Sequence, residues 1–254
     1  MPLQYFDAMR NELARLNVPD GKGTDFADLE AHFIVCSGEA CLMAGARGGV
    51  KVLGDVDKAK REKILNDSRA SITIMRCAST AGSTGPTNFV MQGTKLQEGY
   101  TDKFLLRHGA APGSSFAMSP SAFMTREAWL AMALKRAEGI RAMPVICDHP
   151  DWWAFDVLDG APMHFIDPAV LKIYWDHRIM QGKEEGDTSH VNQLYDQEPA
   201  KNDKVVLHSG VDMLRSAAAV SLGIVDQWKL VNVGLMAVRE GVKNPGMWVN
   251  SAKR

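Results

Sequence analysis

Acidic, amide and histidine side chains gather in two stretches of the chain, at spacings that could support catalysis or metal binding. Asp159 is followed five residues later by His164. In the second stretch, residues 183–197, Asn192 and Asp196 are four residues apart and would share one face of a helix. Two carboxylates that meet repel each other unless a cation lies between them. Mg²⁺ binds through one or two carboxylates and leaves positions for phosphate oxygens. If Asp159 and Asp196 converge, they form a site for such an ion.

Each of these residues also has a simpler interpretation. Asp159 could cap a turn, because aspartate is a poor strand residue and a frequent turn residue. His164 could be a histidine satisfied within its own loop. A third interpretation makes Asp159 and His164 the acid–base pair of an unrelated α/β enzyme that acts on a small molecule. Spacing alone does not decide among these interpretations.

The hydrophobic pattern predicts the elements that would position these residues. Strands are predicted over residues 31–36 (ending near Ser37–Gly38), 50–54, 71–77, 88–93, 152–158 and 179–182. Helices are predicted over about residues 5–16, 125–142 and 167–177, in a region from near 190, and over most of the tail after 205. Antiparallel strands come first and strand–helix alternation follows, which indicates a mixed sheet with helices on its faces. Asp159 falls at the carboxyl end of a strand, where sites collect in α/β sheets.

Composition excludes several classes of function. The 254 residues carry 29 Lys and Arg against 30 Asp and Glu, a net charge of −1, so the domain has no overall basic excess for holding nucleic acid. Four cysteines without CxxC spacing indicate buried thiols in a reducing compartment. No apolar run approaches the roughly 20 residues that span a bilayer, and the start lacks a secretory pattern. We therefore expect an intracellular protein without a membrane partner. GxSxG, GxxxxGK[ST], GxGxxG and HExxH motifs are also absent.

Three segments resemble the DDE superfamily endonuclease domain of pogo-like, Tc1/mariner-type transposases. Residues 68–76, followed by the turn residues 81–86, resemble the first hairpin of that domain. Residues 159–164 are similar to its second-acid motif, Asp-Gly-x-x-x-His, and residues 184–197 to its third-acid motif. The resemblance covers about residues 31–210.

The resemblance implies an RNase H-like fold, which is a mixed five-stranded sheet with helices on both faces. It implies that three acids hold two Mg²⁺ or Mn²⁺ ions for in-line displacement at a DNA phosphodiester. Asp159 and Asp196 would be the second and third acids and the metal ligands. The residues expected to orient them or to face the phosphate are His164, His190 and Asn192. The expected DNA contacts are Lys183, Lys201 and Lys204. DNA would be the partner, a homodimer is left open, and by family analogy the protein would act in the nucleus.

The first-acid position departs from the family pattern. The resemblance places an Asp-Glu pair at the end of the first strand, and the matching residues are Gly38 and Glu39. Neighbouring strand residues point to opposite faces, so Glu39 could replace the missing aspartate only through a bulge or twist at Ser37–Gly38. With that proviso Glu39 joins Asp159 and Asp196 as a candidate catalytic residue. Loss of the first carboxylate predicts weaker metal binding and impaired cleavage. The alternative is a catalytically inactive, domesticated DNA- or protein-binding module.

The expected organisation has three parts. Residues 1–30 would be an N-terminal helical extension, which is too short for a helix-turn-helix module of roughly 50 residues. Residues 31–210 would be the endonuclease-like domain, and residues 211–254 a C-terminal helical tail. The chain would then be an isolated, decayed or domesticated catalytic domain.

Overall fold

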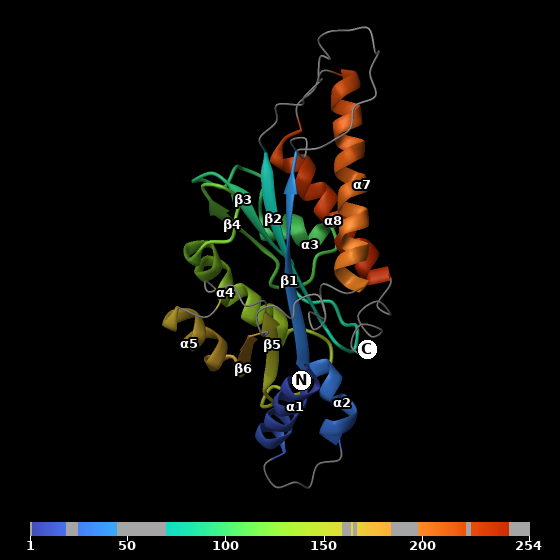
Figure 1. Ribbon diagram of the computed structural model, residues 1–254. Helices are drawn as coiled ribbons and strands as arrows, with labels where there is room; N and C mark the ends of the chain where they lie inside the picture. The colour runs from blue at the N-terminus through green and yellow to red at the C-terminus, as the bar shows by residue number, and fades with distance from the viewer. Residues whose placement is uncertain are drawn as a thin grey trace.

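A six-stranded mixed sheet forms the centre of the computed structural model (Figure 1). The residues that the structure describes are 2–18, 25–44, 70–158, 164, 167–183, 198–221 and 225–243. The strands are β1 (Ile34–Met43), β2 (Ser71–Ser79), β3 (Asn88–Gln92), β4 (Ser115–Ser119), β5 (Ala154–Leu158) and β6 (Ile179–Lys183). Their order across the sheet is β4-β3-β2-β1-β5-β6.

Strand directions identify the fold class. The first three strands are antiparallel neighbours in the order β1, β2, β3. Strand β5 then pairs parallel to β1, and β6 parallel to β5. This arrangement, three antiparallel strands followed by two parallel ones on the far side of β1, is the RNase H-like sheet that was expected. The expected count of five strands was one too low, because β4 pairs parallel to the outer edge of β3.

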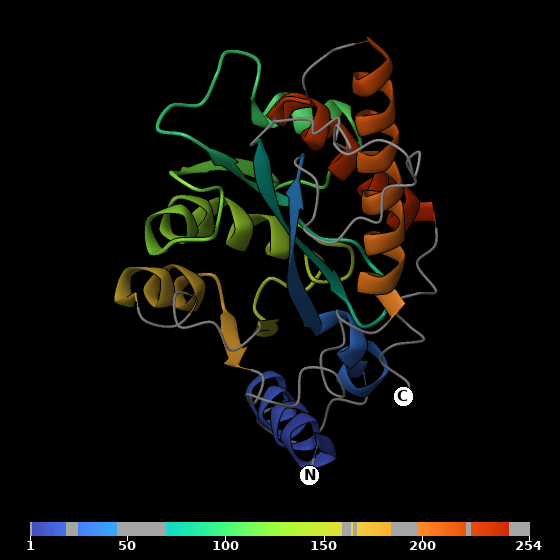
Figure 2. The same cartoon turned by 45° about the horizontal axis from the view of Figure 1, so that its top comes forward.

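Helices cover both faces of the sheet, as Figure 2 shows. One face packs against α4 (Arg126–Arg141) and α5 (Pro168–Asp176), and the same core extends to α1 (Pro2–Asn17) and α2 (Asp25–Phe33). The other face packs against α3 (Asp102–Arg107), α7 (Glu198–Ser221) and α8 (Gln227–Lys243). The sheet therefore separates two hydrophobic cores, and the side chains of each strand alternate between them.

Local signals place several elements where the sequence predicts them. The Thr125 hydroxyl accepts a hydrogen bond from Ala128 N and begins α4. Asp167 accepts from Ala169 N and begins α5, with Pro168 at the first helical position. The predicted strands 71–77, 88–93, 152–158 and 179–182 are confirmed as β2, β3, β5 and β6, and the predicted helix 5–16 is confirmed as part of α1.

The predicted strand 31–36 is wrong at both ends. Residues 31–33 belong to α2, and β1 continues through Gly38 to Met43 instead of ending near Ser37–Gly38. The element pair α3 and β4 was not predicted. The predicted strand 50–54 and the start of the region near 190 lie outside the described residues.

The expected domain boundaries fall inside helices, residue 30 within α2 and residue 210 within α7. No disulfide joins the four cysteines; Cys36 and Cys77 are buried, as expected of the thiols, whereas Cys147 is exposed and the expectation is wrong for it. Among the helices that the structure describes, none is both long enough and apolar enough to cross a bilayer.

Candidate functional site

The carboxyl end of β5 lies between β1 and β6 and leads into the motif that begins at Asp159. Residues Ile34–Cys36 of β1 pair with Phe155–Val157 of β5. On the other side, Leu158 pairs with Lys183, the exposed last residue of β6. Lys183, an expected DNA contact, therefore stands at the same sheet edge as the candidate site.

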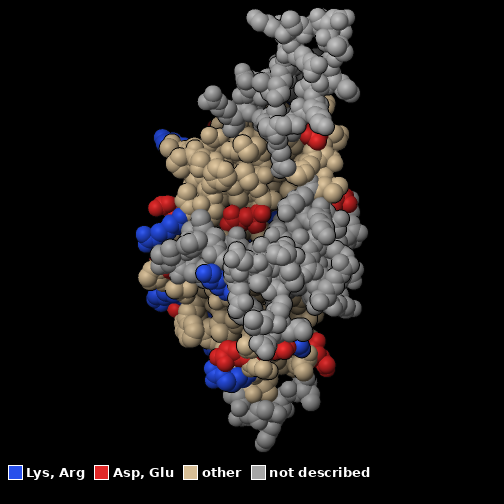
Figure 3. Space-filling view, in the orientation of Figure 1, with Lys and Arg blue, Asp and Glu red and all other residues tan. Residues whose placement is uncertain are grey.

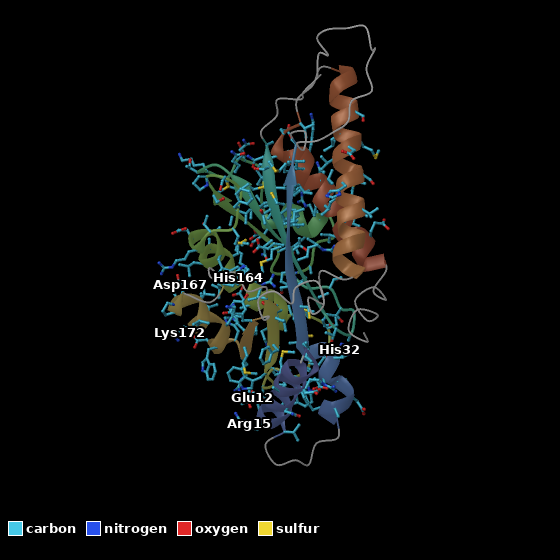
Figure 4. All side chains as sticks on the ribbon, viewed as in Figure 1. Glu12, Arg15, His32, His164, Asp167 and Lys172 are labelled. Carbon is cyan, nitrogen blue, oxygen red and sulfur yellow. The ribbon has the colours of Figure 1, made fainter. Side chains whose placement is uncertain are left out.

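Glu39 and His164 meet, although they are 125 residues apart in the sequence. His164 Nε2 lies 2.9 Å from Glu39 Oε1, with the histidine side chain 1% exposed and the glutamate side chain 23% exposed. Trp129 of α4 donates from its indole nitrogen to the main-chain oxygen of His164 at 3.3 Å, and the two ring centroids lie 4.8 Å apart. His164, which is labelled in Figure 4, thus contacts residues of both β1 and α4. The simple interpretation of His164, a histidine satisfied within its own loop, is wrong.

Glu39 faces α4, and Gly38 belongs to the other face of the sheet. The register of β1 and β2 runs one residue to one residue from Val35 to Met43, so there is no bulge at Ser37–Gly38. Ala40 and Leu42 alternate with Glu39 and lie on the same face of β1 as Gly38. Both belong to the core beneath α7 and α8. The condition under which Glu39 could replace the first acid is therefore not met in β1.

Arg76 of β2 stands directly opposite Gly38 in the antiparallel pair. Residues opposite each other in such a pair share a face of the sheet. Ile72 and Ile74, which lie on the same face of β2 as Arg76, belong to the core beneath α7 and α8. Arg76 is 3% exposed. The position where the resemblance expects a carboxylate thus holds a glycine with a buried cation beside it.

A buried polar network lies on the α4 face of the sheet. The guanidinium of Arg136, on α4, lies 3.3 Å from Asp156 Oδ2 of β5 and donates to Asn88 Oδ1 at 3.1 Å. Arg136 also donates to the hydroxyl of Ser37, which donates in turn to Asp156 Oδ1 at 2.5 Å. Tyr174 of α5 donates to Asp156 Oδ2 at 3.4 Å. The network joins three strands to two helices.

Burial affects the pKa of Arg136 and Tyr174 in this network and that of Cys77, which interacts with Arg136. It raises the pKa of the Cys77 thiol to about 12 and the pKa of the Tyr174 hydroxyl well above its ordinary value. Burial alone would lower the pKa of Arg136, but attraction to Asp156 leaves that pKa above its ordinary value. At neutral pH the arginine stays charged while the thiol and the phenol stay neutral. The network is therefore a structural ion pair rather than a proton relay.

This network was not predicted from the sequence, although each charged member carried a signal. Arg136 follows the spacing of the buried residues Trp129, Met132 and Ala133 on α4. Asp156 interrupts the apolar strand Ala154–Leu158. A charged residue at an apolar position of a buried element indicates a buried partner.

Several expected site residues cannot be placed in this geometry. Asp159, Asp196, His190 and Asn192 lie outside the described residues. Lys201 and Lys204 belong to the first turns of α7, at positions whose side chains are likewise outside the description. Of the expected site, the structure brings together Glu39 and His164, with Lys183 at the nearby end of β6.

The described half of the site does not fit a divalent cation. Among the described residues, no three His, Cys, Asp or Glu side chains lie close enough to hold a metal ion. Gly38 offers no ligand, and Glu39 faces α4 and contacts His164. Arg76 would repel a cation on the α7 face. The expectation of Mg²⁺ or Mn²⁺ rests on Asp159 and Asp196, which lie outside the described residues.

The charge on the surface is mixed. On the face drawn in Figure 3, the described Lys and Arg side chains form small separate groups among Asp and Glu, without one broad basic field. This agrees with the net charge of −1. Contact with a polyanion would have to be local, as at the strand end that carries Lys183.

No family model and no curated protein matches the chain. Among solved structures, it is similar to a pre-cleavage Mos1 transpososome, with a TM-score of 0.47 and 8% identity over 99% of this chain and 60% of that chain. It is also similar to Mos1 transposase in a paired-end complex with the left transposon end, with a TM-score of 0.45 and 9% identity over 98% of this chain and 60% of that chain. A third similar structure is the Mos1 strand transfer complex, with a TM-score of 0.44 and 11% identity over 100% of this chain and 61% of that chain. The chain thus spans about 60% of the length of these Mos1 chains. Its fold class, an RNase H-like α/β protein, follows from its own strand order.

Proposed function

We propose that this chain is a transposase-derived, RNase H-like domain that binds DNA and has lost efficient metal-dependent cleavage. Cleavage or strand transfer at a phosphodiester is the proposed ancestral activity. The chain would then act as a DNA-binding module, in the nucleus if it follows the family.

The contact between Glu39 and His164 carries this proposal. The motif resemblance assigns these residues to separate segments, Glu39 to the first-acid region and His164 to the second-acid motif. They meet at 2.9 Å in a mixed sheet with helices on both faces, the kind of fold that the same resemblance implies. In an unrelated α/β enzyme, contact between residues of these two motif segments would not be expected. The acid–base alternative also weakens, because His164 is buried against Trp129 and Glu39 and is therefore poorly placed to reach a substrate.

The loss of cleavage is proposed from the first-acid position. Gly38 has no carboxylate, Glu39 points to the other face, and Arg76 stands beside Gly38. Two carboxylates from elsewhere in the chain would then have to hold two divalent ions next to an arginine, and binding should be weak.

DNA binding is tested by fluorescence anisotropy of a labelled duplex at increasing salt. We expect log Kd to rise with log salt, because Lys and Arg contacts release counterions from the phosphates. Lys183→Glu should weaken binding at least about tenfold, since it reverses a charge at the end of β6. The matched control is Lys172→Glu, an exposed position of α5, which should change Kd less than about twofold. Failure of the wild-type chain to bind at low salt would contradict the proposal.

Cleavage is tested separately by nicking of supercoiled plasmid with Mg²⁺ or Mn²⁺. The proposal expects wild type and Asp159→Asn to be equally inert. Nicking by the wild-type chain that disappears in Asp159→Asn would show that catalysis survives, and would leave only the DNA-binding part of the proposal.

A further inference from the structure

Aromatic rings and cations share one surface where α3 lies beside α8 (Figures 1 and 2). The ring of Phe104 contacts those of His108 and Trp228, with centroid distances of 4.1 and 4.4 Å. All three side chains are half-buried, so part of each ring is open to solvent. Phe104 and Trp228 pack against the core beneath α7 and α8, whereas Glu39 faces α4. These rings therefore lie apart from the contact between Glu39 and His164.

The sequence of α3 places two cations beside the rings. Phe104 and His108 are four residues apart and are therefore neighbours on the surface of the helix. Lys103 and Arg107 have the same spacing, and each precedes a ring by one residue, which is a rotation of about 100° around the helix axis. Both cations are exposed, and neither forms an ion pair with another described residue. A row of cations thus runs alongside the row of rings, with its charge open to a ligand.

Arg239 of α8 adds a third cation in a fixed position. Its Nε donates to the main-chain oxygen of His108 at 2.9 Å, and the side chain is exposed. No other hydrogen bond joins Arg239 to the part of the chain that the structure describes, so its terminal nitrogens are available to a ligand. These three rings and three cations form the α3–α8 surface: Phe104, His108, Trp228, Lys103, Arg107 and Arg239.

Positive charge predominates here, although the chain as a whole has a net charge of −1. Across the two helices the described cations are Lys103, Arg107, Lys229 and Arg239, and the described carboxylates are Asp102 and Glu240. Asp102 is already paired with Lys135, at 2.5 Å. Just before α8, Asp226 accepts from Lys229 N and caps the helix. The cations still outnumber the carboxylates, which favours a polyanion as the ligand.

Rings and cations in this arrangement fit an unpaired DNA strand better than a duplex. Proteins that bind single strands hold the phosphates with positive charge and stack bases on aromatic side chains, because every base has a π-face. In a duplex those faces are covered by neighbouring bases, so a duplex would contact the cations and leave the rings unused. An acidic protein would likewise contact the cations without needing a row of rings.

We propose that the α3–α8 surface binds unpaired DNA, with bases stacked on its rings and phosphates held by its cations. The inference rests on the proposed function, DNA binding, and adds to it a second contact surface with single-stranded DNA as the ligand. Stacking needs no particular base, so this surface binds without sequence preference.

The test is the affinity of the full chain for a fluorescein-labelled oligodeoxythymidine of about 16 nucleotides, measured by fluorescence anisotropy. A duplex of the same length is measured alongside. Phe104→Leu replaces the central ring by an apolar side chain, and its matched control is Phe123→Leu, which removes an exposed ring in the segment before α4. Lys103→Glu reverses an exposed charge on α3, and its matched control is Lys172→Glu on α5. Circular dichroism checks that each variant folds.

We expect Phe104→Leu to weaken binding of the single strand at least about fivefold, since one stacked base contributes that much, and to change duplex binding less than about twofold. Lys103→Glu should weaken single-strand binding to a similar degree and lower the slope of log Kd against log salt by about 0.7, because one phosphate contact is lost. Each control should change Kd less than about twofold. The inference is overturned if Phe104→Leu loses no more affinity for the single strand than Phe123→Leu, or Lys103→Glu no more than Lys172→Glu.

A second readout covers the case in which Phe104→Leu does not fold. The fluorescence of 2-aminopurine, placed in the middle of the oligonucleotide, falls when that base stacks on a ring. Wild type should quench this fluorescence, and at equal protein concentration Lys103→Glu should quench it less than Lys172→Glu. Binding without quenching, or equal quenching by the two variants, would contradict the inference.

The duplex separates this inference from the proposed function. A wild-type chain that binds the duplex but not the single strand overturns the inference alone. A chain that binds neither DNA at low salt overturns the proposed function, and the inference with it.

Discussion

Removal of the charge on Asp156 should be among the most destabilising single changes in the protein. Asp156→Asn keeps the shape of the side chain but leaves the guanidinium of Arg136 without its counter-charge. Both side chains are fully buried, with the guanidinium 3.3 Å from the carboxylate. Breaking a buried pair by removing one partner costs about 3–5 kcal/mol. At about 2–4 °C per kcal/mol for a chain of this size, Tm should fall by about 6–20 °C. The assay is urea unfolding, followed by circular dichroism, with a thermal scan alongside.

The matched control is Asp176→Asn, which breaks the pair with Lys172 on the surface of α5. Those side chains are 74% and 52% exposed, and such pairs contribute less than about 0.5 kcal/mol. Arg136→Met combined with Asp156→Leu should recover much of the stability lost in Asp156→Asn, because neither charge remains. The reasoning is refuted if Asp156→Asn loses no more stability than Asp176→Asn.

Three further changes test the packing that supports the site. Thr125→Ala removes the hydroxyl that accepts from Ala128 N and should cost about 1 kcal/mol in urea unfolding; an unchanged midpoint would contradict this capping role. Gly139→Ala should destabilise by roughly 1–3 kcal/mol, although alanine favours helices by about 1 kcal/mol, because its Cβ would lie 2.5 Å from Pro112 O; a more stable variant would show that this contact relaxes freely. The folded Cys77 thiol, with a pKa of about 12 against an ordinary 9.0, stays protonated where the unfolded thiol ionises. Its contribution to stability is therefore complete below about pH 9 and is lost between about pH 9 and 12, by up to about 1.4 kcal/mol per pH unit. Cys77→Ala should flatten that decline, and an identical decline in both proteins would contradict the assignment.

The sequence predicted elements whose signals are local. Alternation of apolar residues identified β2, and the turn at residues 81–86 identified its pairing with β3. Thr125 and Asp167 marked the starts of α4 and α5 because capping depends only on the next few residues.

Predictions failed where pairing between distant segments outweighed local preference. The apolar run 31–36 is compatible with either helix or strand, and α2 takes its first three residues. Gly38, Glu39 and Ala40 are poor strand residues, but β2 pairs with each of them and β1 continues. Strand β4 is short and lies at an edge, so its sequence carries little signal.

The candidate site was likewise predictable from the sequence only in part. Motif spacing singled out Glu39 and His164, which meet. The significance of Arg76 and Arg136 depends on their burial, and a sequence does not show burial directly. The absence of a bulge beside Gly38 likewise follows from the register of β1 and β2, which decides that Glu39 faces α4.

DNA binding with and without divalent metal tests the central claim most directly. Anisotropy titrations of one labelled duplex are made with the wild-type chain in EDTA and in Mg²⁺, at matched ionic strength. If the chain binds DNA without a metal ion, the two values of Kd should agree within about twofold. Binding that occurs only with Mg²⁺ would contradict the account, because it would mean that contact with DNA still depends on a divalent ion.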